Sequence, residues 1–197
     1  ARSQGEPVTT KLDLQDGAPV VAMLLVSLAL GYSQYFSSQY MTYDNDVGGH
    51  VEYITIIAKT GTLPPPLGWQ TPQPPLYYLI AAGFYKVGEW LNLEEPVYAA
   101  RFFSLLLYTG FLVLSLLTLR QYLSGWWFAM ASAIVLFWPD GITYPGRISN
   151  DVGMLFSHAL TFYLATRWHC GKYKQPRWLL YACFSAFIGM LIKSSGI

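Results

Sequence analysis

The chain has 197 residues, of which 53% are hydrophobic and 12% are charged, and its formal net charge is +1. Soluble domains carry about a quarter charged residues, so this composition excludes an ordinary soluble protein. Together with long apolar runs, it predicts an all-α, multi-pass protein of the lipid bilayer. No stretch interleaves basic and aromatic residues in the manner of a nucleic-acid-binding surface. The two cysteines, Cys170 and Cys183, have neither metal-site spacing nor the number that a disulfide framework needs.

Residues 1–18 are polar and are expected to form a cytoplasmic tail, followed by a membrane domain over residues 19–197. An apolar run over residues 19–37 predicts the first membrane span, with Pro19 in its first helical turn. No small-residue cleavage site follows the run, which argues against a cleavable signal. The lack of an initiator methionine and the apolar end at Ile197 suggest the N-terminal part of a longer or processed protein.

The next predicted elements lie in an outer loop over residues 38–96. Residues 46–60 predict an amphipathic surface helix that Gly61 ends, because apolar side chains recur on one helical face at Val47, Val51, Ile54 and Ala58. Residues 63–75 contain six prolines and predict an extended loop. Residues 76–91 predict a second helix, which is short for a span and rich in aromatic residues.

The remaining apolar runs predict four more spans, over residues 97–119, 125–139, 152–166 and 178–192. If the helix at 76–91 stays at the surface, the basic loop at 167–177 lies on the cytoplasmic side with the N-terminus. The turn-rich loop at 140–151 then shares the outer side with residues 38–96. If the helix at 76–91 crossed instead, the most basic loop would move outside. The tendency of basic loops to stay in the cytoplasm favours five spans.

Two carboxylates are candidate catalytic groups on the outer side. Asp46 follows the first span closely enough to act there as a general base. His50 lies four residues later, where it could share a helical face with Asp46, and is a candidate substrate-binding residue. Asp44 competes for this role. Asp151 begins a helix on the same side of the membrane. For both Asp46 and Asp151 the alternative is a helix cap.

Basic groups near the outer side are candidate phosphate ligands. They are Arg101, Arg147 and Lys193. The alternative for each is a side chain that extends from a span end toward water. No phosphate-binding loop, zinc motif or nucleophile elbow is present. The sequence therefore establishes no cofactor. The one candidate is a divalent cation bound by Asp46 and Asp151.

Several motifs in a fixed order resemble the N-terminal half of the GT-C membrane glycosyltransferases, in particular the protein O-mannosyltransferases and the aminoarabinose–lipid A transferases. The motifs are Asp46 with His50, the stretch Tyr-Ile-x-Ile-Ile-Ala-Lys-Thr-Gly-x-Leu-Pro from Tyr53, Gln73-Pro-Pro-Leu-Tyr-Tyr, Ala100-Arg-Phe-Phe-Ser, Asn150-Asp and Lys193-Ser-Ser-Gly. No single motif is very specific, whereas the ordered set is fairly specific.

The resemblance implies a polyprenyl- or dolichyl-phosphate sugar donor and an inverting transfer to a lipid, glycan or protein on the non-cytoplasmic side. The membrane would be the bacterial inner membrane or that of the endoplasmic reticulum. The matching positions imply that Asp46 and Asp151 are catalytic and that Arg101 and Lys193 bind substrate. The aromatic helix that begins near Tyr77 is expected to line a sugar or prenyl chain.

This sequence departs from the family pattern at two positions. Val47 stands where the family often has Glu, which leaves the choice between Asp44 and Asp46 open. Gln73 stands where the aminoarabinose transferases have Lys, so Arg147 or Lys193 would supply the charge for phosphate.

Two other functions compete with the enzyme. A non-catalytic membrane subunit or lipid-binding scaffold, acting with a partner in a complex, would keep the same helices. A transporter is disfavoured, because transporters place charged residues within their spans and the charges here gather at span ends.

Overall fold

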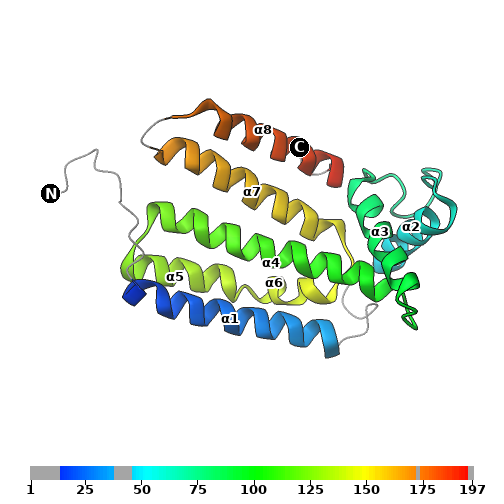
Figure 1. The fold of residues 1–197 in the computed structure, drawn as a ribbon, viewed down its shortest axis with the longest axis horizontal. Coiled ribbons are helices and arrows are strands. Elements are labelled where there is room, and N and C mark those ends of the chain that lie inside the picture. The colour runs from blue at the N-terminus through cyan, green and yellow to red at the C-terminus, as the bar shows by residue number, and fades with distance from the viewer. Residues whose placement is uncertain (1–13, 38–45, 172–173, 195–197) are drawn as a thin grey trace.

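The computed structural model describes residues 14–37, 46–171 and 174–194, and within these ranges it contains helices and no strands (Figure 1). The all-α prediction is therefore confirmed for the described part of the chain. The elements are α1 (Leu14–Ser37), α2 (Val47–Thr60), α3 (Leu76–Trp90), α4 (Val97–Tyr122), α5 (Gly125–Leu136), α6 (Pro139–Thr143), the 3₁₀ helix η1 (Tyr144–Gly146), α7 (Asn150–Cys170) and α8 (Pro176–Ile192).

Five of these helices run side by side, and two gather at one end. In Figure 1, α1 and α5 lie beside α4, α7 lies on the other side of α4, and α8 covers α7. Helices α2 and α3 lie across the end of this bundle at which α1 finishes and α4 begins. The chain thus forms an elongated helical body with a small helical cap, and the cap is the predicted outer loop.

Two of the described helices are long and apolar enough to cross a membrane, at Gly17–Ser37 and Val97–Tyr122. Two other apolar helices are shorter, with 12 residues in α5 and 17 in α8. Large apolar side chains are exposed on the outer faces of the bundle, for example Leu25, Ile134, Phe162 and Phe184. These faces fit contact with lipid, while the number of spans stays a prediction.

Small residues bring the helices of the bundle close together. Gly189 of α8 packs against Ser157 of α7, where an added Cβ would lie 2.7 Å from the Ser157 Oγ. The hydroxyls of Ser157 and Ser185 each donate to the other residue's backbone carbonyl, at 2.7 and 3.1 Å. Ser27 of α1 donates to the carbonyl of Leu136 at the end of α5, at 2.6 Å. Such close contacts are typical of helices that associate within a bilayer.

The outer helices form as predicted. Helix α2 ends at Gly61, whose φ of 73° is the left-handed conformation that glycine adopts without strain. The proline-rich segment that follows has no α-helix up to Leu76. It returns the chain so that α3 packs on α2, and Tyr53 of α2 stacks on Tyr78 of α3 in the buried contact between them. The buried core at this end is therefore aromatic.

Three local predictions were wrong. Helix α1 begins at Leu14, inside the predicted tail, so Pro19 lies within the helix rather than in its first turn. The predicted loop at 140–151 instead contains α6, which Pro139 starts, and η1. The third predicted span, at 125–139, forms α5, which ends at Leu136 and not at 139, because Pro139 lacks the amide that a helix interior needs.

Candidate active site

The carboxylate of Asp46 lies at the start of α2, where the chain enters the cap. Asp46 precedes the first residue of α2, and its backbone carbonyl accepts a hydrogen bond from the amide of His50 at 3.2 Å. Its side chain makes no capping hydrogen bond to the helix. Its Oδ1 instead accepts a hydrogen bond from the indole N–H of Trp69, at 2.7 Å. Asp46 thus occupies the N-cap position of α2, while its carboxylate contacts Trp69, and its role as a catalytic base stays a prediction.

His50 lies one turn further along α2 and faces inward. Its ring is buried, with 3% exposure, and its Nδ1 lies 2.9 Å from the hydroxyl of Tyr78 on α3. The two rings stack with their centroids 5.7 Å apart, and Tyr78 stacks on Tyr53 at 4.0 Å. His50 therefore joins α2 to α3 beneath Asp46. Its predicted contact with substrate stays a prediction.

Tyr78 lies within the electrostatic reach of both candidate catalytic carboxylates. Burial is the main cause that raises its pKa, and the neighbouring Tyr77 and Tyr53 raise the pKa further. The charges of Asp151 and Asp46 act in the same direction. Two carboxylates that are far apart in sequence thus act on one phenol, which keeps its proton at neutral pH.

Asp151 and Lys193 connect the beginning of α7 to the end of α8. Ser149 caps α7 by accepting a hydrogen bond from the Asp151 amide at 3.2 Å, and its hydroxyl donates to Oδ2 of Asp151 at 3.1 Å. Oδ1 of Asp151 forms an ion pair with Lys193. Asp151 is thus a first-turn residue, and Ser149 is the cap. The pair is half-buried and leaves both groups in reach of a ligand.

The proline-rich segment reaches the same place from the cap. The side-chain oxygen of Gln73 accepts a hydrogen bond from the hydroxyl of Ser194, at 3.4 Å. The backbone carbonyl of Gln73 accepts another from Tyr53, at 3.3 Å. Tyr77 is fully buried, and its hydroxyl lies 2.7 Å from Oγ of Ser104 on α4. The structure therefore brings Gln73, Tyr77 and Lys193 to the same junction between cap and bundle.

Two predicted phosphate ligands have contacts elsewhere. Arg101 is fully buried in α4, donates to the backbone carbonyl of Gln34 at 3.2 Å and lies over the ring of Tyr35. Arg147 pairs with Asp140 at 3.0 Å within its own loop. Among the ion pairs of the described residues, Lys193 is the cation that contacts a candidate catalytic carboxylate, Asp151. Asp44 lies outside the described residues.

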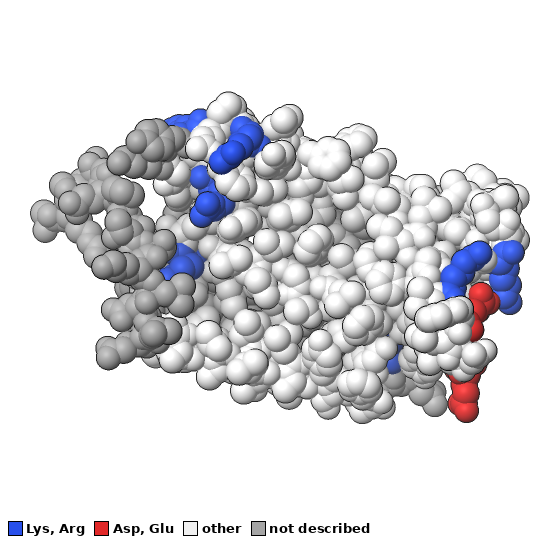
Figure 2. Space-filling view, viewed as in Figure 1, with Lys and Arg blue, Asp and Glu red and all other residues white. Residues whose placement is uncertain are grey.

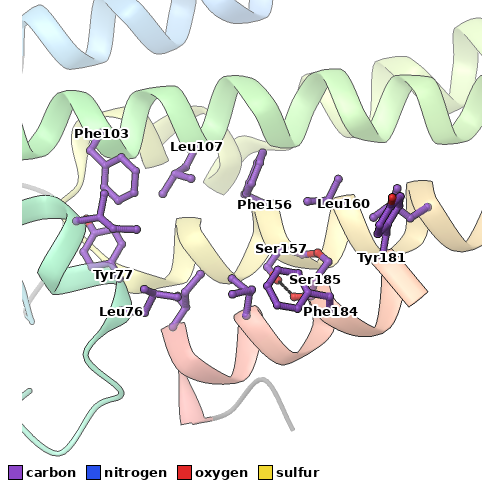
Figure 3. Close-up of a pocket in the computed structure, with 14 residues that line it drawn as sticks. Leu76, Tyr77, Phe103, Leu107, Phe156, Ser157, Leu160, Tyr181, Phe184 and Ser185 are labelled. Carbon is purple, nitrogen blue, oxygen red and sulfur yellow. Dashed lines mark hydrogen bonds between the residues drawn. The ribbon is translucent and has the colours of Figure 1, made fainter. Parts of the chain in front are cut away.

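An apolar pocket of about 460 Å³ opens beside this junction (Figure 3). It lies between α3, α4, α7 and α8, and Tyr77 and Ile192 line it. Ile192 directly precedes Lys193, so one wall of the pocket adjoins the ion pair. The hydroxyls of Ser157 and Ser185 also border the pocket, but both already donate to backbone carbonyls. The pocket is therefore suited to an apolar occupant.

Trp69 and Tyr78 were not recognised from the sequence. Trp69 stands in a proline-rich stretch whose path no periodic pattern gives. Tyr78 was one of several aromatic residues in a short helix, and nothing local marked it as the residue that His50 would meet. The sequence offered one signal for Trp69, which is a large aromatic residue between a glycine and a glutamine in an outer loop. A large ring in an exposed loop suggests a contact or binding role, because loops often carry functional residues.

The described residues hold no group of three or more His, Cys, Asp and Glu side chains that could bind a metal ion. The oxygens of Asp151 contact the ammonium of Lys193 and the hydroxyl of Ser149. That ammonium supplies the positive charge that a cation would bring. A divalent cation at Asp46 and Asp151 stays a prediction, and the donors that the structure brings together do not favour it.

Comparison with known proteins gives one finding. A family model described as dolichyl-phosphate-mannose-protein mannosyltransferase matches residues 68–197. The matched part begins in the proline-rich segment and includes Gln73, Tyr77, Asp151 and Lys193, whereas Asp46 and α2 precede it. No curated protein and no solved structure matches the chain.

Proposed function

Because the chain belongs to the dolichyl-phosphate-mannose-protein mannosyltransferase family, a family of membrane glycosyltransferases, we propose that it transfers a sugar from a dolichyl- or polyprenyl-phosphate donor. The acceptor is a lipid, glycan or protein on the non-cytoplasmic side of the membrane. The observation that carries this proposal is the ion pair between Asp151 and Lys193, which adjoins the apolar pocket where the cap meets the bundle.

The proposal includes five spans and an outer cap. Helices α1, α4, α5, α7 and α8 run side by side and would cross the bilayer, while α2 and α3 lie across one end (Figure 1). This arrangement supports a membrane domain over residues 19–197 with the cap outside. The short α5 would cross together with α6, which continues the chain toward the outer side.

In the proposed reaction, Asp46 removes the proton from the acceptor hydroxyl while its oxygen attacks the anomeric carbon of the sugar. The bond between that carbon and the phosphate oxygen breaks, and the lipid phosphate leaves with both electrons. Attack from the side opposite the phosphate inverts the configuration. The indole of Trp69 fixes the direction of the Asp46 carboxylate, which would set its angle to the acceptor.

Lys193 would bind the phosphate of the donor. Its ammonium lies at the junction, and Asp151 holds it there through the ion pair. A phosphate that approaches would share the ammonium with Asp151, and the positive charge would stabilise the leaving group. Asp151 thus acts through Lys193 in this proposal and does not need to contact the sugar.

The apolar pocket would accommodate the first part of the lipid chain. Its wall at Ile192 adjoins Lys193 in sequence, so a phosphate at Lys193 would place the attached chain at the pocket. Its volume of about 460 Å³ is within the usual range for ligand pockets. Burial of the chain between α4, α7 and α8 would add apolar contact area that a soluble sugar phosphate lacks.

The alternative function is a non-catalytic subunit or lipid-binding scaffold. The family match begins at residue 68, so the part of the chain that carries the proposed base lies outside it. A subunit of this kind would keep the pocket and the Lys193 pair and would bind the donor lipid without transferring its sugar.

The test is transfer of labelled mannose from dolichyl-phosphate mannose to membrane acceptors, in membranes that carry the full-length protein. We expect Asp46→Asn to lower the rate by about a hundredfold or more, as loss of a general base does. Glu52→Gln is the matched control, because Glu52 is exposed on the same helix. Equal rates for wild type and Asp46→Asn would exclude Asp46 as the base. Donor binding without transfer in the wild type would favour the subunit.

A further inference from the structure

Basic side chains gather at the end of the bundle opposite the cap (Figure 2). Arg167 at the end of α7, Lys174 in the following loop and Arg177 at the start of α8 are all exposed. These three residues, here called the basic collar, take no part in the ion pairs described for the chain, which both lie near the cap. The charge of the collar is therefore uncompensated within the described residues.

The collar holds its charges close together on aromatic rings. The guanidinium carbons of Arg167 and Arg177 lie 5.3 and 5.4 Å from the centroid of the Trp178 ring. The ammonium of Lys174 lies 5.4 Å from the ring of Trp168. The face of each indole attracts these cations, which favours their positions over the rings. Two like charges over one ring still repel each other, and an anion beside them would remove that repulsion.

The surroundings of the collar point to a lipid anion. The start of α5 at the same end exposes Trp126 and Trp127, and tryptophans at this density mark the interface between membrane and water. Next to Arg177, α8 exposes Leu179 and Leu180, by 42% and 67%. A ligand at the collar thus meets guanidinium groups at one side and an apolar helix face at the other.

We propose that the basic collar is a binding site for anionic phospholipids, with the headgroup phosphate held by Arg167 and Arg177 and an acyl chain lying along Leu180. Guanidinium groups form paired hydrogen bonds to phosphate oxygens, and Lys174 adds a third positive charge. The site is separate from the proposed site of transfer, because the length of the bundle lies between them (Figures 1 and 2). It would anchor the ends of α7 and α8, the two helices that also carry Asp151 and Lys193.

The test is a titration of the purified full-length protein, in phosphatidylcholine micelles, with phosphatidylglycerol that carries a dansyl group on its acyl chain. Energy transfer from tryptophan reports binding. We expect Arg167→Gln with Arg177→Gln to weaken binding by about 30-fold, or about fivefold for each charge removed. The control, Lys59→Gln with Lys86→Gln, removes the same charge from exposed positions on α2 and α3 and should bind as the wild type does.

Two further arms separate charge from folding and lipid from free anion. Arg167→Lys with Arg177→Lys keeps the charge but loses the paired hydrogen bonds, so its binding should lie between those of the wild type and the Gln variant. A loss equal to that of the Gln variant would overturn the contribution of charge to the proposal. Inorganic phosphate at millimolar concentration should not displace the labelled lipid, and displacement would show a simple anion site instead. Unchanged binding in the Gln variant would also overturn the proposal. None of these readouts depends on sugar transfer.

Discussion

The indole N–H of Trp69 contacts the proposed base directly, and this contact can be removed without changing the charge of the site. Trp69→Phe keeps an aromatic ring and deletes the donor that lies 2.7 Å from Oδ1 of Asp46. A hydrogen bond to a charged group contributes about 1.5–3 kcal/mol when buried, and less at this exposed position. We therefore expect the rate of sugar transfer to fall by about tenfold, with the KM for donor nearly unchanged.

Trp90→Phe serves as the control for this prediction. Trp90 is 78% exposed at the end of α3, close to the exposure of 77% at Trp69. Steady-state kinetics of the two variants in the same membranes separate the loss of the donor from a general effect of removing an exposed indole. A rate for Trp69→Phe equal to that of Trp90→Phe would mean that Asp46 does not depend on the indole.

The ion pair between Asp151 and Lys193 allows folding and donor binding to be measured separately. Partly exposed pairs contribute about 0–1 kcal/mol to stability, so Lys193→Gln should remain folded, with a thermal midpoint close to that of the wild type. Loss of the ammonium should raise the KM for dolichyl-phosphate mannose by about tenfold, as expected for a charged contact to phosphate. Lys193→Arg should restore most of the binding. An unchanged KM in Lys193→Gln would remove Lys193 from the site.

Local sequence patterns identified some of these side chains and missed others. Asp46 and His50 were predicted together from their spacing of four residues, and the structure places Asp46 directly before α2 and His50 in its first turn. Trp69 and Tyr78 could not be found in this way, because their contacts with Asp46 and His50 depend on how the proline-rich segment returns. Arg147 was a candidate from its position near the outer side, and its pairing with Asp140 depends on the turn between them.

At the scale of elements, the contact between α7 and α8 depends on the missing side chain of Gly189. A Cβ at this position would lie 2.7 Å from Oγ of Ser157, whose hydroxyl holds the two helices together. Gly189→Ala should therefore lower the free energy of unfolding by about 1–3 kcal/mol. Gly83→Ala on α3 has nothing within 4 Å of the new Cβ and should raise stability by up to about 1 kcal/mol. Denaturation in detergent micelles measures both, and equal effects of the two changes would contradict this account.

Helix boundaries were predictable where one residue fixes them and less so where apolar runs continue past a break. Gly61 ends α2 and Asn150 begins α7 as their sequences indicate. In the run from Gly125, hydrophobicity continues to Trp138 while the helix stops at Leu136, because Pro139 starts α6. Hydrophobicity indicates whether a segment is surrounded by lipid or protein, and it does not specify the backbone conformation. The loop at 140–151 was therefore predicted without its two short helices.

For the whole molecule, the distribution of charge separates two layouts of the helices in the membrane. Asp46 and Glu52 lie at the start of and on α2, and Glu94 follows α3, so these carboxylates belong to the cap, while basic side chains gather at the other end of the bundle (Figure 2). With α3 at the surface, the cap is outside and the collar is cytoplasmic. If α3 crossed the membrane, residue 94 would be cytoplasmic and the collar would lie outside. The positive-inside rule favours the first layout.

The native cysteines allow these layouts to be tested in intact cells. Cys170 is exposed beside the collar, Cys183 is exposed on the apolar face of α8, and Glu94→Cys adds a thiol to the exposed link between α3 and α4. A membrane-impermeant maleimide should label residue 94 in intact cells and Cys170 after permeabilisation only. Cys183 should stay unlabelled in both cases, since lipid covers it. Removal of each native thiol with Cys170→Ser and Cys183→Ser assigns the label.

The opposite pattern, with Cys170 labelled in intact cells and residue 94 protected, would mean that α3 crosses the membrane. Labelling of both thiols from the same side would exclude both layouts. Three helices, α4, α5 and α7, separate residue 94 from Cys170, and an odd number of crossings must place the two positions on opposite sides. Labelling from one side would therefore show that one of these helices does not cross. The candidates are α5, with 12 residues, and α7, because of the three only α4 is both long and apolar enough to span. The experiment thus tests whether the helices between residue 94 and Cys170 all cross the membrane, which their lengths and hydropathy do not establish.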